Sequence, residues 1–235
     1  MKRMLAAVLA CTAAAALTAC SAPEETSNAS ASAQEQTSSQ PASAVSSGTS
    51  AQPAADGSIL IAYFTVLETD GVDTVSSASR VAADSGVVGN THYIAQAIQQ
   101  SVGGDLFAIE TVQEYPGTHD ELLEFAYNEL QDNARPELAA QIENPDDYSV
   151  IFLGYPNWNS DLPMPLYTFL ESYDFSGKTI IPFVTHGGSG FSRTISTIQE
   201  LQPGATVAED GFSVSRNAVA DAAQDAMDWA ASAIG

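Results

Sequence analysis

The segment from Tyr148 to Pro165 constrains the fold more than any other part of this chain; it reads YSVIFLGYPNWNSDLPMP. Its apolar stretch, Val150–Leu153, is continuous, which is typical of a strand buried on both faces of a parallel sheet. We expect this strand to break at Gly154 into a loop that exposes Trp158, and a helix to follow the loop.

A second apolar strand, Thr179–Thr185, ends in a similar way, in the glycine-rich sequence His186–Gly190. In an open parallel sheet, ligands bind where the strands end and the loops begin. An aromatic loop and a glycine-rich loop therefore follow two strands of the same sheet. Together they predict the walls of a pocket for a flat ligand.

The rest of the sequence alternates between strand and helix patterns. Apolar runs predict strands at 59–64 and 106–109 and a weaker pair at 205–207 and 212–214. Apolar residues at helical spacing predict helices at 91–102, 120–133, 163–173, 192–201 and 221–234, and Pro136 can start a short helix that reaches Ile142.

This alternation predicts an α/β fold, a three-layer α/β/α sandwich around a five-stranded parallel sheet. Residues 58–235 are the right length for a single domain. Five strands in a domain of this length fit the strand order 2-1-3-4-5. The first strand is not followed by Gly-x-Gly-x-x-Gly, which argues against a Rossmann domain.

Residues 1–20 have the layout of a secretory signal: Lys2 and Arg3, then an apolar segment shorter than the roughly 20 residues that span a bilayer. The segment ends in Leu-Thr-Ala-Cys20, which resembles the lipobox of bacterial lipoproteins. The resemblance implies lipidation of Cys20; the alternative is an ordinary signal peptide. Both readings predict an extracytoplasmic protein, attached to the membrane only through the lipid if Cys20 is modified.

Residues 21–57 consist mostly of Ser, Ala, Thr, Gln and Pro, and we expect a disordered linker there. Cys11 and Cys20, the two cysteines of the chain, both precede this linker. The expected domain therefore has no disulfide and no thiolate ligand. Its three histidines lack metal-ligand spacing, so no metal site is expected.

The formal net charge is -22. The expected domain has five cationic side chains, Arg80, Arg135, Lys178, Arg193 and Arg216. So few cations cannot form a basic patch, which excludes nucleic acid as a partner. An acidic surface serves solubility and can also steer a basic redox partner.

Tyr-Pro-x-Trp followed by Leu-Pro-Met-Pro, and a strand that ends in Thr-His-Gly-Gly-Ser-Gly, resemble the flavodoxin-like family of bacterial flavoproteins. The resemblance covers nearly all of residues 59–234. It implies a doubly wound fold that holds one FMN non-covalently at the carboxyl ends of strands one, three and four.

Flavodoxins hold the FMN phosphate in a loop directly after strand one. Here Thr65 follows that strand, and Gly89, Asn90 and Thr91 stand about two dozen residues later, where a helix is expected. We interpret them as one phosphate loop split by an insertion, Val66–Val88, with Asn90 or Thr91 as a helix cap. Hydroxyl, amide and free helix N–H groups can bind an anion without a cation. The alternative is a plain turn and cap, and the insertion is either an idle loop or a lid in which Arg80 could add charge.

The resemblance places Pro156, Asn157 and Trp158 beside the flavin ring, with Trp158 as stacking surface and Asn157 in a turn that needs left-handed backbone angles. Asn159 stands where many relatives have a second Trp. The alternative for Trp158 is ordinary packing inside the protein.

The resemblance also places His186, Gly187 and Gly188 at the pyrimidine edge of the flavin, where the backbone N–H groups of the glycines would meet the ring oxygens. His186 could tune the reduced flavin, or could simply be hydrogen-bonded in place. We expect Ser189 and Ser192 to cap the following helix.

The sequence therefore predicts an FMN-binding protein that exchanges electrons with a redox partner protein or a small molecule. Two alternatives stay open: an FMN-dependent NAD(P)H or quinone oxidoreductase, and a cofactor-free binding module with the same fold. A serine hydrolase is excluded because the Gly-x-Ser-x-Gly elbow is lacking.

Overall fold

The computed structural model describes residues 58–68, 80–83 and 86–235. The expected signal segment with Cys20, the expected linker and most of the insertion lie outside these residues. Among the residues described, no helix is both long and apolar enough to cross a membrane.

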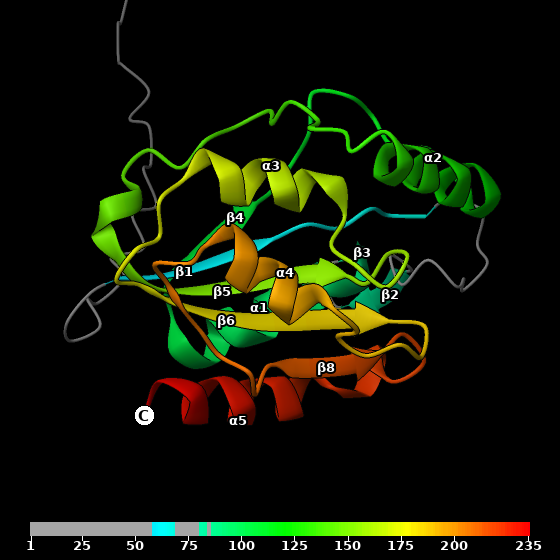
Figure 1. Cartoon of the computed structure of the whole chain (residues 1–235). Helices are drawn as coiled ribbons and strands as arrows, with labels where there is room; N and C mark the ends of the chain where they lie inside the picture. The colour runs from blue at the N-terminus through cyan, green and yellow to red at the C-terminus, as the bar shows by residue number, and fades with distance from the viewer. Residues whose placement is uncertain (1–57, 69–79, 84–85) are drawn as a thin grey trace, which may run out of the picture. The chain divides into compact units, whose positions relative to one another are not determined.

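The centre of the fold is a parallel sheet (Figure 1). Its strands are β1 (Ser58–Tyr63), β4 (Asp105–Ala108), β5 (Tyr148–Pro156), β6 (Thr179–His186), β7 (Thr206–Val207) and β8 (Phe212–Ser215). The order is β4-β1-β5-β6, and both β7 and β8 pair with β6. The predicted order 2-1-3-4-5 is therefore confirmed, with the fifth position shared by two short strands.

Helices cover both faces of the sheet, which confirms the three layers (Figure 1). One face carries α1 (Asn90–Val102) and α5 (Ala223–Ile234), and the other carries α3 (Met164–Ser172) and α4 (Thr194–Leu201). The helix α2 (His119–Gln131) adds Leu122 and Ala126 to the core of the second face. Short 3-10 turns stand before β5 (Pro145–Asp147) and before α5 (η2, Val219–Asp221).

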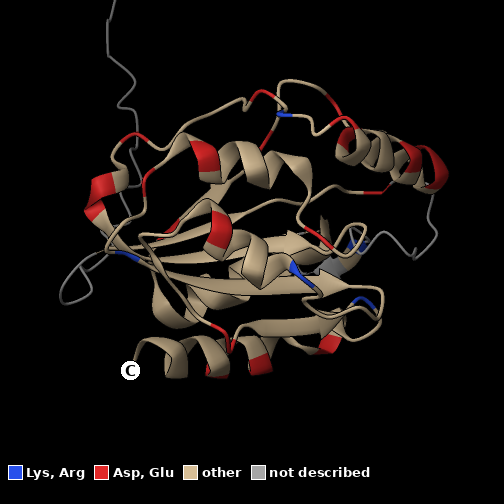
Figure 2. Cartoon of the chain, in the orientation of Figure 1, with Lys and Arg blue, Asp and Glu red and all other residues tan. Residues whose placement is uncertain are grey.

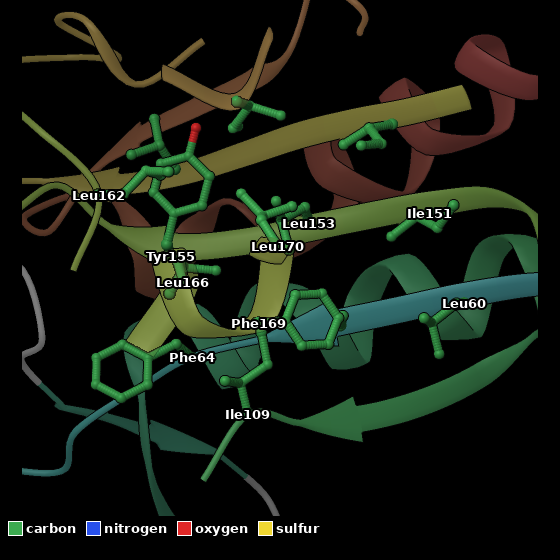
Figure 3. Close-up of a cluster of buried hydrophobic side chains, with 14 of the residues drawn as sticks. Leu60, Phe64, Ile109, Ile151, Leu153, Tyr155, Leu162, Leu166, Phe169 and Leu170 are labelled. Atoms are coloured by element: carbon green, nitrogen blue, oxygen red, sulfur yellow. The ribbon is translucent and has the colours of Figure 1, made fainter. Parts of the chain in front are cut away.

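Alternating residues of the strands feed two separate cores. In β1, Leu60 and Ala62 face the α3/α4 side, whereas Ile59 and Ile61 face the α1/α5 side. Figure 3 shows how side chains of α3 and of the strands interlock in the first of these cores. Burial on both faces explains why the strands read as continuous apolar runs in the sequence.

The predicted break at Gly154 is wrong, because β5 continues through it to Pro156. The ring of Phe183 on the neighbouring strand lies over Gly154, and a Cβ at this position would stand 2.0 Å from the ring. Gly154 is therefore needed for packing between strands, and the loop begins two residues later than expected.

The predicted short helix from Pro136 to Ile142 is also wrong. The chain is extended there: Val112 N donates to Glu137 O at 2.9 Å and Ala139 N donates to Glu110 O at 2.8 Å. The segment pairs with the chain that follows β4, and this pairing outweighs the helix-starting preference of Pro136.

The insertion contains an antiparallel hairpin that the sequence did not predict, β2 (Arg80–Ala83) and β3 (Gly86–Gly89). Val81 is buried in the α1/α5 core, so the hairpin is attached to the domain. Its last residue, Gly89, leads directly into α1.

Acidic residues dominate the described surface, and basic segments are few and scattered (Figure 2). This distribution agrees with the net charge of -22. It favours small anion sites built from single side chains over an extended basic surface.

Candidate functional site

The site is built at the edge of the sheet where the parallel strands have their carboxyl ends (Figure 1). Thr65 lies just beyond β1, Asn157 follows β5, and His186 ends β6. Parallel pairing brings these three strand ends to one edge. The three loops that the sequence singled out therefore share a location.

Thr65 and Gly89 are neighbours in space, although the insertion separates them in the chain. A Cβ built on Gly89 would lie 2.1 Å from Oγ1 and 3.2 Å from Cβ of Thr65. Glycine is therefore required for this close approach. The two halves of the split loop come together as the sequence predicted.

The first residues of α1 do not act as helix caps, so that prediction is wrong. The N-cap position is Gly89, and no side chain caps the helix. Thr91 instead turns inward, and its Oγ1 lies 2.9 Å from Oγ1 of Thr185 in β6. Asn90 is only 1% exposed. The start of α1 is thus fixed against the sheet, with its backbone N–H groups uncapped by side chains.

Three residues in the loops after β1 and β5 and at the start of α1 each have a buried polar atom with no hydrogen-bond partner among the residues that the structure describes: Thr65 Oγ1, Asn90 Nδ2 and Asn157 Oδ1. Most buried polar groups in proteins are paired, because leaving one unpaired costs about 1–3 kcal/mol. All three belong to residues predicted from the sequence as cofactor ligands. Their convergence indicates groups kept ready for a ligand.

Trp158 is buried, with 5% of its surface exposed, so the expectation of an exposed ring is wrong. Its ring centroid lies 5.4 Å from that of Phe64, edge to face, and 5.8 Å from that of Tyr115. Pro156, the last residue of β5, is buried as well. Trp158 therefore joins the core beneath the loop, as in the packing alternative, and a stacking role for it stays a prediction.

A tight turn spans Trp158 to Asp161, whose backbone N and O atoms exchange hydrogen bonds of 3.1 and 2.9 Å. The two central residues have positive φ, 55° at Asn159 and 64° at Ser160. The left-handed residues are thus Asn159 and Ser160, and not Asn157 as predicted. Both are exposed. A turn with two positive φ angles favours Asn, which explains the presence of Asn159 in this turn.

Asn157 connects the two ring-side loops. Its backbone N donates to Thr185 O at 2.9 Å, and its Nδ2 donates to Gly190 O at 2.7 Å and to Ser192 Oγ at 3.2 Å. These bonds leave its Oδ1 as the unpaired acceptor. Asn157 therefore holds the loop after β5 against the loop after β6.

The side chain of Asp161 fixes the end of this turn through hydrogen bonds inside the protein. Its carboxylate is 1% exposed and accepts hydrogen bonds from Arg193 and Tyr167. The hydroxyl of Thr197 and the backbone N of Leu162 donate to it as well, each at 2.9 Å. Burial opposes its ionisation, but these donors outweigh burial and lower the pKa of Asp161.

His186 is half-buried, and burial lowers its pKa. Its Nδ1 accepts a hydrogen bond from Gly188 N at 2.9 Å, so the ring carries no proton on Nδ1. The prediction that the Gly188 N–H is free for a ligand is therefore wrong. Gly188 needs its glycine, since its φ is 138°. Gly187 and Gly188 are exposed at the edge of the site.

The predicted serine caps of α4 are also wrong. Arg193 occupies the N-cap position, and no side chain caps the helix. Ser192 has a φ of 50° and donates to Ser189 O at 3.1 Å, which closes the glycine-rich loop on itself. The two serines shape the loop and do not start the helix.

Three residues at this edge were not among the cofactor ligands predicted from the sequence: Thr185, Asp161 and Arg216. Thr185 was counted as a strand residue, although its position next to His186 placed it at the strand end. Asp161 carried no signal besides its position after a turn. Arg216 was noted only as a cation, but its backbone N bonds His186 O at 2.8 Å.

A family model for flavodoxin matches residues 79–229, which is more than half of the chain. The match begins after β1 and includes Gly89, Asn157 and His186. No curated protein matches the chain.

Among the solved structures of similar fold are three bacterial proteins. A protein of Bacteroides uniformis ATCC 8492 that is assigned as a flavoprotein is 26% identical, with a TM-score of 0.50, over 70% of this chain and 96% of that chain. A protein of Bacteroides eggerthii DSM 20697 with the same assignment is 25% identical, with a TM-score of 0.49, over 74% and 99%. A flavoprotein of Lactobacillus acidophilus NCFM in complex with FMN is 17% identical, with a TM-score of 0.48, over 72% and 99%.

The matched segment contains the hairpin strand β3, the uncapped start of α1 and both loops that flank the site. This chain belongs to the flavodoxin family.

Proposed function

We propose that this protein binds one FMN at the carboxyl edge of its sheet and acts as an electron carrier. The observation that carries the proposal is the convergence of three buried, unpaired polar atoms, on Thr65, Asn90 and Asn157, within the described residues. Membership of the flavodoxin family gives the chemical identity of the ligand that these atoms fit.

The phosphate would lie at the start of α1. Thr65 Oγ1 and Asn90 Nδ2 are free to donate, and the uncapped N–H groups of the helix add a favourable dipole. Gly89 allows the backbone to come close. The hydroxyl contact between Thr91 and Thr185 fixes the helix start, so this seat is ordered before a ligand arrives.

The flavin ring would lie between the turn at Asn159 and Ser160 and the loop at His186–Gly188. Asn157 sets the spacing of these loops and keeps Oδ1 as an acceptor. Asp161 holds the turn in place. A bound flavin supplies the one- and two-electron chemistry, and the protein sets its orientation and its electrostatic surroundings.

His186 offers one device for tuning the electrostatics of the ring. Because its Nδ1 accepts from Gly188 and burial lowers its pKa, the imidazole is neutral at neutral pH. A neutral ring adds no positive charge beside a reduced flavin. A neutral His186 suits an electron carrier in which backbone dipoles set the reduction potential of the flavin.

We propose further that the domain works outside the cytoplasm, tethered through a lipid on Cys20. The lipobox-like sequence before Cys20 and the polar composition of residues 21–57 support this location. A linker of this length has a root-mean-square span of roughly 30–35 Å. Incorporation of labelled palmitate that is lost in Cys20→Ser tests the tether.

The carrier role is tested with FMN-loaded full-length protein. After chemical reduction it should pass electrons to a soluble one-electron acceptor, and NADH or NADPH should reduce it only slowly and without saturation. Saturable turnover with NADH and a quinone would overturn the carrier role in favour of an oxidoreductase. Failure to take up FMN would overturn the cofactor as well and leave a cofactor-free binding module.

A further inference from the structure

Arg216 lies at the same edge of the sheet as the loops of the site. It directly follows β8, and its backbone N donates to His186 O at 2.8 Å. This bond continues the parallel ladder of β6 and β8 by one residue. The backbone of Arg216 is thus fixed beside the glycine-rich loop.

The register of β8, continued by one residue, directs the side chain of Arg216 toward the α1 face of the sheet. Side chains alternate along a strand, and Val214, two residues earlier, is buried in the α1/α5 core. Val214 pairs with Thr185, whose hydroxyl meets Thr91 in the first turn of α1. Strand spacings of about 4.8 Å across and 6.6 Å for two residues along put the Cα atoms of Arg216 and Thr185 roughly 8 Å apart.

Two guanidinium nitrogens of Arg216, Nε and Nη1, are buried and lack a hydrogen-bond partner among the described residues. Three other cations of the described domain are paired: Arg135 with Glu171, Arg193 with Asp161, and Lys178 with the Tyr148 carbonyl. The remaining cation, Arg80, is exposed to solvent. An unpaired buried charge is costly. In a chain with 29 acidic residues, an unpaired Arg indicates an anion that comes from outside the chain.

The neighbouring groups specify the anion. Asn90 is 1% exposed, and its Nδ2 lacks a partner, as does Thr65 Oγ1. Both stand at the uncapped start of α1, the helix that Thr185 and Thr91 bind to β6. The neutral donors of Thr65 and Asn90, together with the planar cation of Arg216, match the several oxygens of a phosphate group.

We propose that Arg216 binds the phosphate of the flavin nucleotide and makes the site selective for FMN over riboflavin. This inference rests on the proposed function and adds a cation to a seat otherwise made of neutral donors. In an acidic protein, the cation offsets the repulsion of a phosphate dianion.

The test compares FMN and riboflavin on full-length protein by quenching of flavin fluorescence. Arg216→Gln should weaken FMN binding by about 10- to 100-fold, the value of one charge-assisted contact. It should change riboflavin affinity by less than about twofold, since riboflavin has no phosphate. Arg216→Lys should recover part of the loss.

Lys178→Gln is the matched control, because it also removes one positive charge but at the amino end of β6. It should change the affinity for either flavin by less than about twofold. Inorganic phosphate should compete with FMN on wild-type protein, and it should compete only weakly on Arg216→Gln.

The stability of the ligand-free protein separates a ligand role from a packing role. Loss of an unpaired buried charge should leave Tm unchanged or raise it by up to about 4 °C in Arg216→Gln. A clear drop in Tm together with equal losses for FMN and riboflavin would overturn the inference.

If Arg216→Gln does not fold, competition by inorganic phosphate on wild-type protein decides the question, and its absence overturns the inference. Wild-type protein that binds FMN and riboflavin equally well would overturn the role of Arg216 and leave flavin binding intact. Wild-type protein that binds neither flavin would overturn the proposed function itself.

Discussion

The hydroxyl oxygens of Thr91 and Thr185 lie 2.9 Å apart, although 94 residues separate them in the chain. This buried contact joins the first turn of α1 to the carboxyl end of β6. It therefore connects the two sides of the site, the proposed phosphate seat and the glycine-rich loop. The contact allows both halves of a nucleotide site to be rigid before the ligand binds.

Gly89→Ala should disrupt the phosphate seat. The new Cβ would lie 2.1 Å from Oγ1 and 3.2 Å from Cβ of Thr65. Thr65 must therefore rotate its hydroxyl away from its present position, and the tight contact with its Cβ pushes the two loop halves apart. We expect FMN affinity to fall by at least about 10-fold, measured by fluorescence titration. Val87→Ala, at a 51% exposed position of the same hairpin, is the control and should bind normally. Normal binding by Gly89→Ala would contradict this account of the loop.

Thr65→Val should separate binding from stability. The substitution keeps the shape of the side chain and removes a hydroxyl that has no partner among the described residues. Free energy of unfolding should stay the same or rise by about 1 kcal/mol, while FMN binds about 5- to 15-fold more weakly. Urea denaturation and FMN titration measure the two effects.

The control is Thr194→Val, because the hydroxyl of Thr194 donates to Phe191 O at 2.7 Å and accepts from Tyr155. It should lose about 1–3 kcal/mol of stability. A loss of stability in Thr65→Val comparable to that in Thr194→Val would show that the Thr65 hydroxyl is structural.

Trp158→Ala should act mainly on folding. Trp158 is buried between Phe64 and Tyr115, and loss of a large aromatic side chain from a core costs about 3–5 kcal/mol. Thermal and urea unfolding measure this cost, and Trp229→Ala at the half-buried α5 position gives the comparison. A Trp158→Ala protein of unchanged stability that no longer binds FMN would restore the stacking role.

The Asp161 network should make stability sensitive to acid. Because the folded-state pKa of Asp161 lies below the ordinary value of 3.8, its stabilisation is present above that value. It is lost as the pH falls through the folded-state pKa. Asp161→Asn should cost about 1–3 kcal/mol at pH 6.

The difference in unfolding free energy between wild-type protein and Asp161→Asn should shrink as the pH falls from 6 to 3. Urea denaturation at each pH measures it. A difference that is constant across this range would mean that the carboxylate charge contributes nothing. Asp161 is also the residue that closes the exposed turn at Asn159 and Ser160.

The fold was predictable from the sequence because both faces of the sheet are buried. Continuous apolar runs such as Val150–Leu153 and helical spacing in α1 and α5 are local signals, and they gave the layers and the strand order. The errors came where distant contacts override local preference. Pro136 favours a helix start, but pairing of Glu137 and Ala139 with the chain after β4 keeps the segment extended.

The site was predictable in location but less so in detail. Glycine and polar residues at strand ends pointed to Thr65, Gly89 and Asn90, and the structure brings Thr65 and Gly89 together. Their role as FMN ligands stays a prediction. The sequence does not reveal which way a side chain turns, so Trp158 was expected at the surface and Thr91 at a helix cap. Arg216 lacked a sequence signal, because its place beside His186 depends on the pairing of β6 with β8.

The most direct test is calorimetric titration of full-length, flavin-free protein with FMN. The account predicts one FMN per chain with a Kd below about 1 µM, and clearly weaker binding in Thr65→Val. Heat below detection at micromolar FMN, with protein shown to be folded by its thermal transition, would contradict the claim that this edge of the sheet is a flavin nucleotide site.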